Sequence, residues 1–344
     1  MKRWIDVIIL IVVMVLILPS LIVAIFSKRD STVPPPIFQP GEEEESIKVK
    51  ESDGAAYYDE PTITLYNHYS KALEPMPLEE YVEGVLAAEM PASFEMEALK
   101  AQAVAARTLA VRKMKASGGS GCTNHKGADV CSQYSHCQAW IPKSQQEKNW
   151  GNKYEENAQR IHRAVGETRG YIMTYNDKPI EVFFYSTSNG KTEDSAEVFS
   201  AALPYYTIVD SPGEESAPRF RETFSFTNKK FAEIFKGKSP KSGLSAGNLK
   251  ESIKILNRTE SGRVGTLMVG DIKIKATDFR VMYGLNSTDF SFRYEGDKIY
   301  IDTVGYGHGV GMSQTGANAM ALAGKGFTEI LKHYYRGVKL QIFL

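Results

Sequence analysis

An uncharged apolar run at residues 7–26 constrains this chain of 344 residues more than any other feature. At ~1.5 Å per residue, a helix of this length spans about 30 Å, the thickness of the hydrocarbon core of a bilayer. We therefore expect a transmembrane signal anchor over residues 7–27, after a short cytoplasmic tail of residues 1–6. A cleaved signal peptide is the alternative, because Pro19 and Ser20 interrupt the run. Against cleavage, the run is longer than the ~7 to 15 apolar residues of a usual signal peptide.

The segment after this run is rich in proline and acidic residues. It contains consecutive prolines at 34–36 and consecutive glutamates at 42–45. Such a composition buries little apolar surface and stays solvated. We expect residues 28–60 to form a flexible linker and residues 61–344 to form an extracytoplasmic catalytic domain. The 41 basic residues balance 41 acidic ones, so no net positive charge directs the chain to nucleic acid.

The patterns within residues 61–344 predict an α+β domain, with mixed helices and short strands around a substrate groove. A first helix ends before Pro91, since proline disfavours helical geometry in the preceding residue. Ser93 and Ser313 are in position to cap later helices. The predicted helices are 78–90, a second helix from Ser93 to about 115, 153–166 and one through 317–323; the predicted strands are 63–66, 171–175, 180–185 and several short strands in 224–301.

Glu89 lies on the apolar face of the first predicted helix, next to the end of that helix. Its neighbours at helical spacing are Val85, Val82, Tyr81 and Leu78. A carboxyl group among hydrocarbon side chains is partly desolvated, which raises its pKa. Glu89 is therefore our candidate for a general acid near neutral pH.

Arg107 lies in an alanine-rich stretch of the second predicted helix and is close enough in sequence to reach the corner that holds Glu89. Two roles remain open for it. In the first, Arg107 binds substrate. In the second, it forms a buried pair with an acidic residue.

Two further segments carry polar groups suited to a neutral polyhydroxyl ligand. Ser186, Ser188 and Asn189 follow an apolar strand, and Tyr306 and His308 stand between glycines at alternate positions from 305 to 311. These glycines leave the backbone bare enough for close approach of a ligand. The alternatives are an ordinary strand-to-turn exit and a hydrogen-bonded structural histidine. The glycine pattern does not fit a phosphate-binding loop.

All three cysteines lie in one polar loop, at positions 122, 131 and 137, and His68 adds a further donor in the same half of the chain. His125, Cys131, His136 and Cys137 supply two sulfurs and two imidazoles, which suits a tetrahedral zinc ion. Four protein ligands close the coordination sphere, so such an ion would be structural. A single disulfide with one spare thiol is the alternative.

Three blocks of sequence resemble the signature blocks of the stage II sporulation protein D family. They read LAAEMPASFEMEALKAQAVAART, FYSTSNGKTE and GYGHGVGMSQTGA. Their order and spacing agree with the family, and the resemblance covers roughly residues 62–344. It implies a lytic transglycosylase, a carbon–oxygen lyase that cleaves peptidoglycan during engulfment of the forespore. It also implies a single-pass protein of the septal or engulfing membrane, with stage II sporulation proteins P and M as partners.

The resemblance also implies roles for individual residues. Glu89 would be the catalytic acid and base, and Arg107 would be needed for activity. Some members of the family bind zinc through a His/Cys loop like residues 125–137. The groove would be lined by Ser186, Ser188, Asn189, Tyr306 and His308, and Asp210 falls in a Val-Asp-Ser-Pro run that resembles another activity-linked stretch.

Two alternatives to this activity remain open. Related domains occur in a protein that enhances a cell-wall amidase, so the chain could be a glycan-binding scaffold. A serine hydrolase built from Ser186 or Ser188 with His308 and Asp210 is the other alternative, although the sequence has no G-x-S-x-G elbow.

Overall fold

The computed structural model of the protein describes residues 60–199 and 201–343. The predicted tail (1–6), membrane span (7–27) and nearly all of the predicted linker (28–60) lie outside these residues. Within the described part, no helix is both long and apolar enough to cross a bilayer. The predicted α+β class is confirmed, because helices and short strands alternate along the chain.

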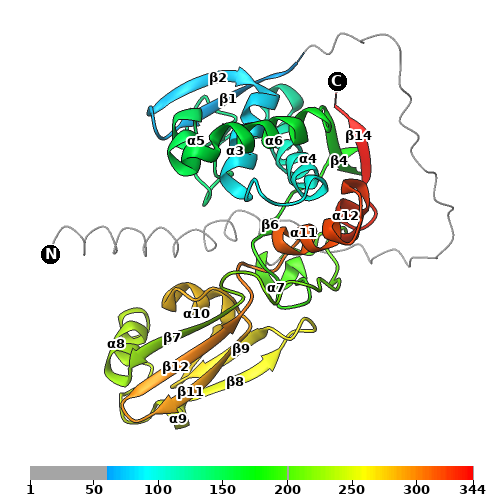
Figure 1. The fold of residues 1–344 in the computed structure, drawn as a ribbon. Coiled ribbons are helices and arrows are strands. Elements are labelled where there is room, and N and C mark those ends of the chain that lie inside the picture. Colours follow the sequence, from blue (N-terminus) through cyan, green and yellow to red (C-terminus); the bar gives the residue numbers. More distant parts are fainter. Residues whose placement is uncertain (1–59, 200, 344) are drawn as a thin grey trace.

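The upper part of Figure 1 is a lobe in which helices pack around one central helix. That helix, α4 (Met96–Lys113), contacts four other α-helices and two strands. Its alanines Ala101, Ala103, Ala105 and Ala106 have no exposed surface, so neighbouring elements approach its backbone closely. The other helices of this lobe are α3 (Leu78–Glu89), α5 (Lys143–Trp150), α6 (Tyr154–Gly166), α11 (Gln314–Leu322) and α12 (Phe327–Tyr334).

Short strands join distant parts of the chain to this lobe. One sheet has the order β2-β1-β3, in which β1 is antiparallel to β2 and parallel to β3. A second sheet has the order β14-β4-β5, and a third joins β6 to β13 in parallel. The bounds are β1 (Thr62–Asn67), β2 (Ala72–Pro77), β3 (Val130–Cys131), β4 (Tyr171–Tyr175), β5 (Lys178–Pro179), β6 (Phe184–Tyr185), β13 (Met312–Ser313) and β14 (Lys339–Ile342).

A second lobe, at the bottom of Figure 1, is formed by residues 221–304 and has its own hydrophobic core, which includes Phe231, Phe279 and Phe290. Two sheets with the orders β11-β12-β7 and β10-β9-β8 form it, together with three helices. Helix α7 (Ser195–Phe199) lies between the lobes (Figure 1). The elements of the second lobe are β7 (Arg221–Thr227), α8 (Asn228–Lys238), α9 (Leu249–Ser252), β8 (Ile253–Arg258), β9 (Val264–Val269), β10 (Ile272–Lys275), α10 (Ala276–Tyr283), β11 (Phe290–Glu295) and β12 (Lys298–Val304).

Two predicted boundaries differ from the structure. Helix α4 begins at Met96 rather than after Ser93, because residues 91–94 first form a turn in which the Phe94 N–H donates to the Pro91 carbonyl. The predicted strand 180–185 is reduced to β6, because the Glu181 N–H donates to the hydroxyl of Tyr205 and not to a neighbouring strand. By contrast, Ser313 caps α11 as predicted, since its hydroxyl accepts from the Gly316 N–H.

Candidate functional site

Glu89 is the last residue of α3, where its side chain remains partly exposed. The predicted apolar face is confirmed, because Leu78, Val82 and Val85 have no exposed surface. Burial of the carboxyl group raises the pKa of Glu89 to about 7. The backbone N–H of Ala139 donates to Glu89 Oε1 at 2.8 Å and opposes this shift. A carboxyl group with this pKa is available in both protonation states near neutrality.

The third signature block lies directly against this carboxylate residue. Gln314 begins α11, and its Nε2 donates to the backbone carbonyl of Glu89 at 3.0 Å. The strand pairing of β6 with β13 then places the second block beside the third, with Ser313 opposite Tyr185. The three blocks are therefore neighbours in space, although more than 200 residues separate Glu89 from Gln314 in the sequence.

Arg107 forms a buried ion pair and is not exposed to a ligand. Its side chain has no exposed surface, and its Nε donates to Glu79 Oε1 at 2.9 Å. A second guanidinium nitrogen also binds the Glu79 carboxylate, and a third donates to the Tyr171 carbonyl at 3.2 Å. This geometry matches the second of the two roles that the sequence left open, a buried pair with an acidic residue. Through these contacts Arg107 holds α3, α4 and β4 together.

The polar residues of the second block are used inside the protein. Ser188 is fully buried, and its hydroxyl donates to the Lys191 carbonyl at 2.7 Å. Asn189 Nδ2 donates to Asp289 Oδ2 at 3.0 Å and so connects the two lobes. Ser186, the remaining predicted groove residue of this block, is partly exposed. Within the described residues, its hydroxyl forms a hydrogen bond only with the hydroxyl of its neighbour Thr187.

The glycines of the third block allow close approach of the protein's own backbone. Gly311 has a φ of 77°, and a Cβ at this position would lie 2.1 Å from the Phe183 carbonyl oxygen. The His308 ring is also held by the protein's own backbone. The Val310 N–H donates to its Nδ1, and its Nε2 lies 3.1 Å from the Phe184 carbonyl oxygen. Burial, together with the Arg280 guanidinium, lowers the pKa of His308 to about 3. The His308 ring is therefore uncharged near neutral pH, and both of its nitrogens face backbone groups.

Tyr306 and Asp210 lie at the surface. Tyr306 is partly exposed, and the Arg219 guanidinium carbon lies 4.6 Å from the centre of its ring. Asp210 is exposed, and its backbone carbonyl accepts from His333 Nε2 at 2.7 Å. The hydroxyl of Ser188 and both ring nitrogens of His308 are bound to backbone groups, so they do not form the nucleophile and base of a serine hydrolase.

Sequence reasoning missed Glu214, which organises the second and third blocks. This carboxylate is 1% exposed and accepts from Ser188 N–H at 2.6 Å and from the Ser313 hydroxyl at 2.6 Å. The Ser211 hydroxyl donates to its other oxygen. The signal was absent because Glu214 belongs to no motif. It lies in the polar run GEES, which reads as a solvated turn.

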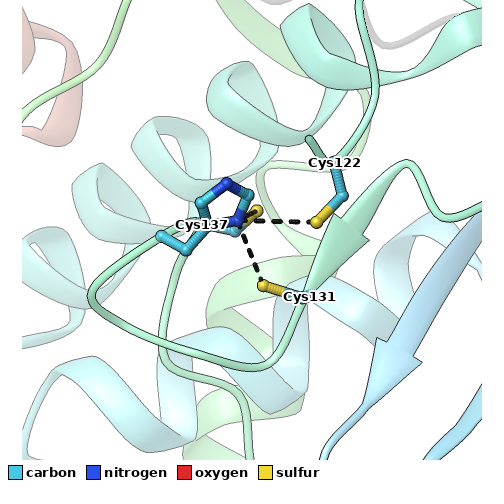
Figure 2. A group of neighbouring side chains, drawn as sticks. Cys122, Cys131 and Cys137 are labelled. Carbon is cyan, nitrogen blue, oxygen red and sulfur yellow. Dashed lines mark hydrogen bonds between the residues drawn. The ribbon is translucent and has the colours of Figure 1, made fainter. Parts of the chain in front are cut away.

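The cysteines and His136 form a compact group of metal-binding donors (Figure 2). His136 Nδ1 lies 3.5, 3.4 and 3.3 Å from the sulfurs of Cys122, Cys131 and Cys137. A tetrahedral zinc ion with usual bond lengths needs N–S separations of about 3.5 Å. Thr123 Oγ1 lies 2.8 Å from His136 Nε2 and can fix the ring with Nδ1 toward the sulfurs. These residues therefore fit a zinc ion, and all three thiols are free in the structure.

The predicted ligand set differs in one member, because Cys122 takes the place of His125 beside Cys131, His136 and Cys137. The Cys122 N–H donates to the Ala128 carbonyl, which folds the loop back onto β3 and leaves His125 at its tip. There the His125 ring stacks on Tyr66, with 3.6 Å between ring centres.

Comparison with known proteins identifies relatives that cover most of the chain. The chain is 40% identical over 299 residues to stage II sporulation protein D of Bacillus amyloliquefaciens, which covers 85% of this chain and 83% of the relative. It is also 40% identical to stage II sporulation protein D of Bacillus subtilis, over 81% of this chain and 78% of the relative.

The chain belongs to the stage II sporulation protein D family. Residues 66–175 match the family model described as Stage II sporulation protein, and this range contains both Glu89 and the cysteine loop. An amidase enhancer of Bacillus subtilis is 29% identical over 75% of this chain but only 40% of its own length. Membership of the sporulation family implies a role in sporulation.

Proposed function

We propose that this protein is a lytic transglycosylase that cleaves the glycan strands of peptidoglycan between N-acetylmuramic acid and N-acetylglucosamine. The observation that supports this activity most directly is Glu89, a partly exposed carboxyl group whose pKa is raised to about 7 by burial. Family membership supports the same activity, as does the arrangement in which the third signature block contacts Glu89 and the second lies beside the third.

Glu89 would perform both proton transfers of the reaction. The protonated carboxyl group donates its proton to the oxygen that leaves with N-acetylglucosamine. The resulting carboxylate then accepts the proton of the C6 hydroxyl of N-acetylmuramic acid, which attacks C1 of the same ring. The product carries a 1,6-anhydro end. Because the nucleophile belongs to the substrate, much of the entropic cost of positioning it is already met.

The surroundings of Glu89 support a mechanism with one carboxylate. Within the described residues, the carboxyl group of Glu89 accepts one hydrogen bond, from the Ala139 N–H, and forms none with a second acidic side chain. A glycosidase that uses water or a covalent intermediate would need two flanking carboxyl groups. A cavity of about 330 Å³ lies beside α3 and is lined by Glu80, Glu83 and Trp140 but not by Glu89.

The pH dependence of cleavage follows from the raised pKa of Glu89. The bond-breaking step needs the protonated carboxyl group, so the rate is expected to fall as the pH rises through about 7. The pH dependence is measured as the initial rate of cleavage of peptide-free glycan strands at pH values on both sides of about 7, with the fragments quantified by mass spectrometry. A rate that keeps rising well above this pH would contradict Glu89 as the general acid.

The relationship to an amidase enhancer supports a second candidate function, a glycan-binding scaffold that assists a cell-wall amidase. The same digest separates the two functions. A transglycosylase releases fragments that are lighter by one water than hydrolysis products, whereas a scaffold releases none.

For the cellular setting we propose a protein anchored by residues 7–27, with its catalytic domain outside the membrane during engulfment. Its proposed partners are stage II sporulation proteins P and M. Family membership supports this setting.

We also propose that Cys122, Cys131, His136 and Cys137 hold a structural zinc ion. The loop that carries them continues to Ala139, whose N–H binds Glu89, so the ion would fix the loop that contacts the catalytic residue. When bound, zinc would supply cross-linking of this loop and no chemistry on the substrate.

Cys131→Ser is expected to lower the melting temperature and to remove the zinc, because a structural zinc ion contributes directly to folding. Thermal unfolding and elemental analysis of the purified protein measure both effects. Lys126→Ala, an exposed residue of the same loop, is the matched control. Wild-type protein that contains no zinc would end the proposal.

A further inference from the structure

A second group of donors lies beside the four cysteine-loop ligands. It consists of His68, His125 and Cys131, whose donor atoms lie within 4.8 Å of one another. The two groups share one residue, Cys131. The rings of His68 and His125 are 5.0 Å apart between centres and meet edge to face.

The fold places this second group by the pairing of two strands. In the parallel pair β1–β3, Tyr66 lies opposite Cys131, and His68 follows directly after the end of β1. Ser132 holds His68 in place, because its hydroxyl lies 3.0 Å from both the backbone nitrogen and Nδ1 of His68. Tyr66 supports His125 on the other side through the stacked rings. Both imidazoles are thus fixed by contacts that the cysteine-loop ligands do not make.

The chemistry of the shared residue allows it to serve both groups. A cysteine thiolate has more than one lone pair and can bind two soft or borderline cations at once. Three thiolates around a single Zn²⁺ leave one net negative charge, which a second cation beside Cys131 would offset. Imidazole nitrogen and thiolate sulfur are both ligands that zinc accepts.

We propose that His68 and His125 bind a second zinc ion, with the Cys131 thiolate as a bridge to the first. This inference rests on the proposed structural zinc and goes beyond it. His68 is exposed and His125 partly exposed, whereas Cys122 and Cys131 are buried. The second ion would therefore keep a solvent-facing position for water or another small ligand, unlike the closed first site.

The test is the zinc content of the full-length protein after exposure to zinc and removal of loosely bound metal. Wild-type protein is expected to retain two zinc ions per chain. His68→Ala with His125→Ala is expected to retain one, with little change in melting temperature, because the first group is intact. His162→Ala, an exposed histidine of α6, is the matched control and is expected to retain two.

Cobalt in place of zinc gives a second readout that does not depend on activity. The double histidine variant is expected to bind half as much cobalt as the wild type. It is expected to keep the thiolate-to-cobalt absorption band of the first site. Cys131→Ser is expected to lose both ions, because it removes the shared ligand.

Three outcomes would overturn the second ion. One is a single zinc per wild-type chain that survives loss of both histidines. Another is a single zinc that His125→Ala removes and Cys122→Ser does not, which would establish the four-ligand set of residues 125–137. The third is a double histidine variant that still retains two ions. Failure of the first site would appear separately, as wild-type protein without zinc.

Discussion

Glu89→Gln is expected to abolish measurable cleavage of glycan strands while the protein still folds. The change is nearly isosteric, keeps an oxygen that can accept from the Ala139 N–H, and removes the transferable proton. General acid–base catalysis contributes roughly 10²- to 10⁴-fold, and here one carboxyl group supplies both proton transfers. Mass spectrometry of the digest measures the loss. Glu83→Gln is the matched control, because Glu83 lies on the same helix and only pairs with His162 at the surface.

The same variant carries a second, opposite effect on stability. Burial raises the pKa of Glu89 from 4.5 to about 7 in the folded protein. The folded state therefore binds the proton more tightly than the unfolded state, and the free energy of unfolding falls as the pH rises between these values. Glu89→Gln removes this dependence. Above a pH of about 7 the variant is expected to be more stable than wild type, by on the order of 3 kcal/mol.

Denaturant unfolding at two pH values measures that difference. A variant that is inactive and less stable at both values would show that Glu89 supports the fold, and the assignment as catalytic acid would fail. Full activity in the variant would end the assignment directly.

Arg107→Ala is expected to lower the free energy of unfolding by about 3–5 kcal/mol, because it leaves the Glu79 carboxylate without its partner in the protein interior. Loss of activity in this variant would follow from loss of the fold. Unfolding in urea, measured beside the activity on glycan strands, separates the two effects.

The double change Arg107→Met with Glu79→Leu is the matched variant, because it removes both charges and keeps apolar volume. Replacing a buried ion pair in this way is often neutral for stability. The double variant is expected to fold and to cleave glycan strands. A stable but inactive double variant would show that the guanidinium itself takes part in the reaction.

Helix periodicity predicted which residues of α3 are buried beside Glu89, because local spacing alone decides this pattern. The residues one and two turns before Glu89 are buried because α3 presents them to α4, and that follows from spacing alone. The Ser313 cap depends on a neighbouring residue only and was predicted for the same reason.

Contacts between distant residues could not be predicted in this way. Arg107 and Glu79 are 28 residues apart, and nothing in either local pattern selects this partner among 41 acidic residues. Whether Cys122 or His125 joins the other three metal-binding donors depends on a backbone hydrogen bond, from the Cys122 N–H to the Ala128 carbonyl, that folds the loop onto β3. The Ala139 N–H that binds Glu89 carries no signal in the side chains at all.

The second lobe begins and ends at adjacent points of the first. The Gly305 N–H donates to the Phe220 carbonyl at 2.7 Å, so the two chain segments that connect residues 221–304 to the first lobe lie side by side. A chain shortened there could be closed by a tight turn without disturbing the helices around α4. Deleting the second lobe would nevertheless destabilise the first, because the buried Glu193 carboxylate would lose its hydrogen bonds from the hydroxyls of Thr259 and Ser261. The lobe is thus an insertion by topology but a fixed part of the protein by its polar contacts.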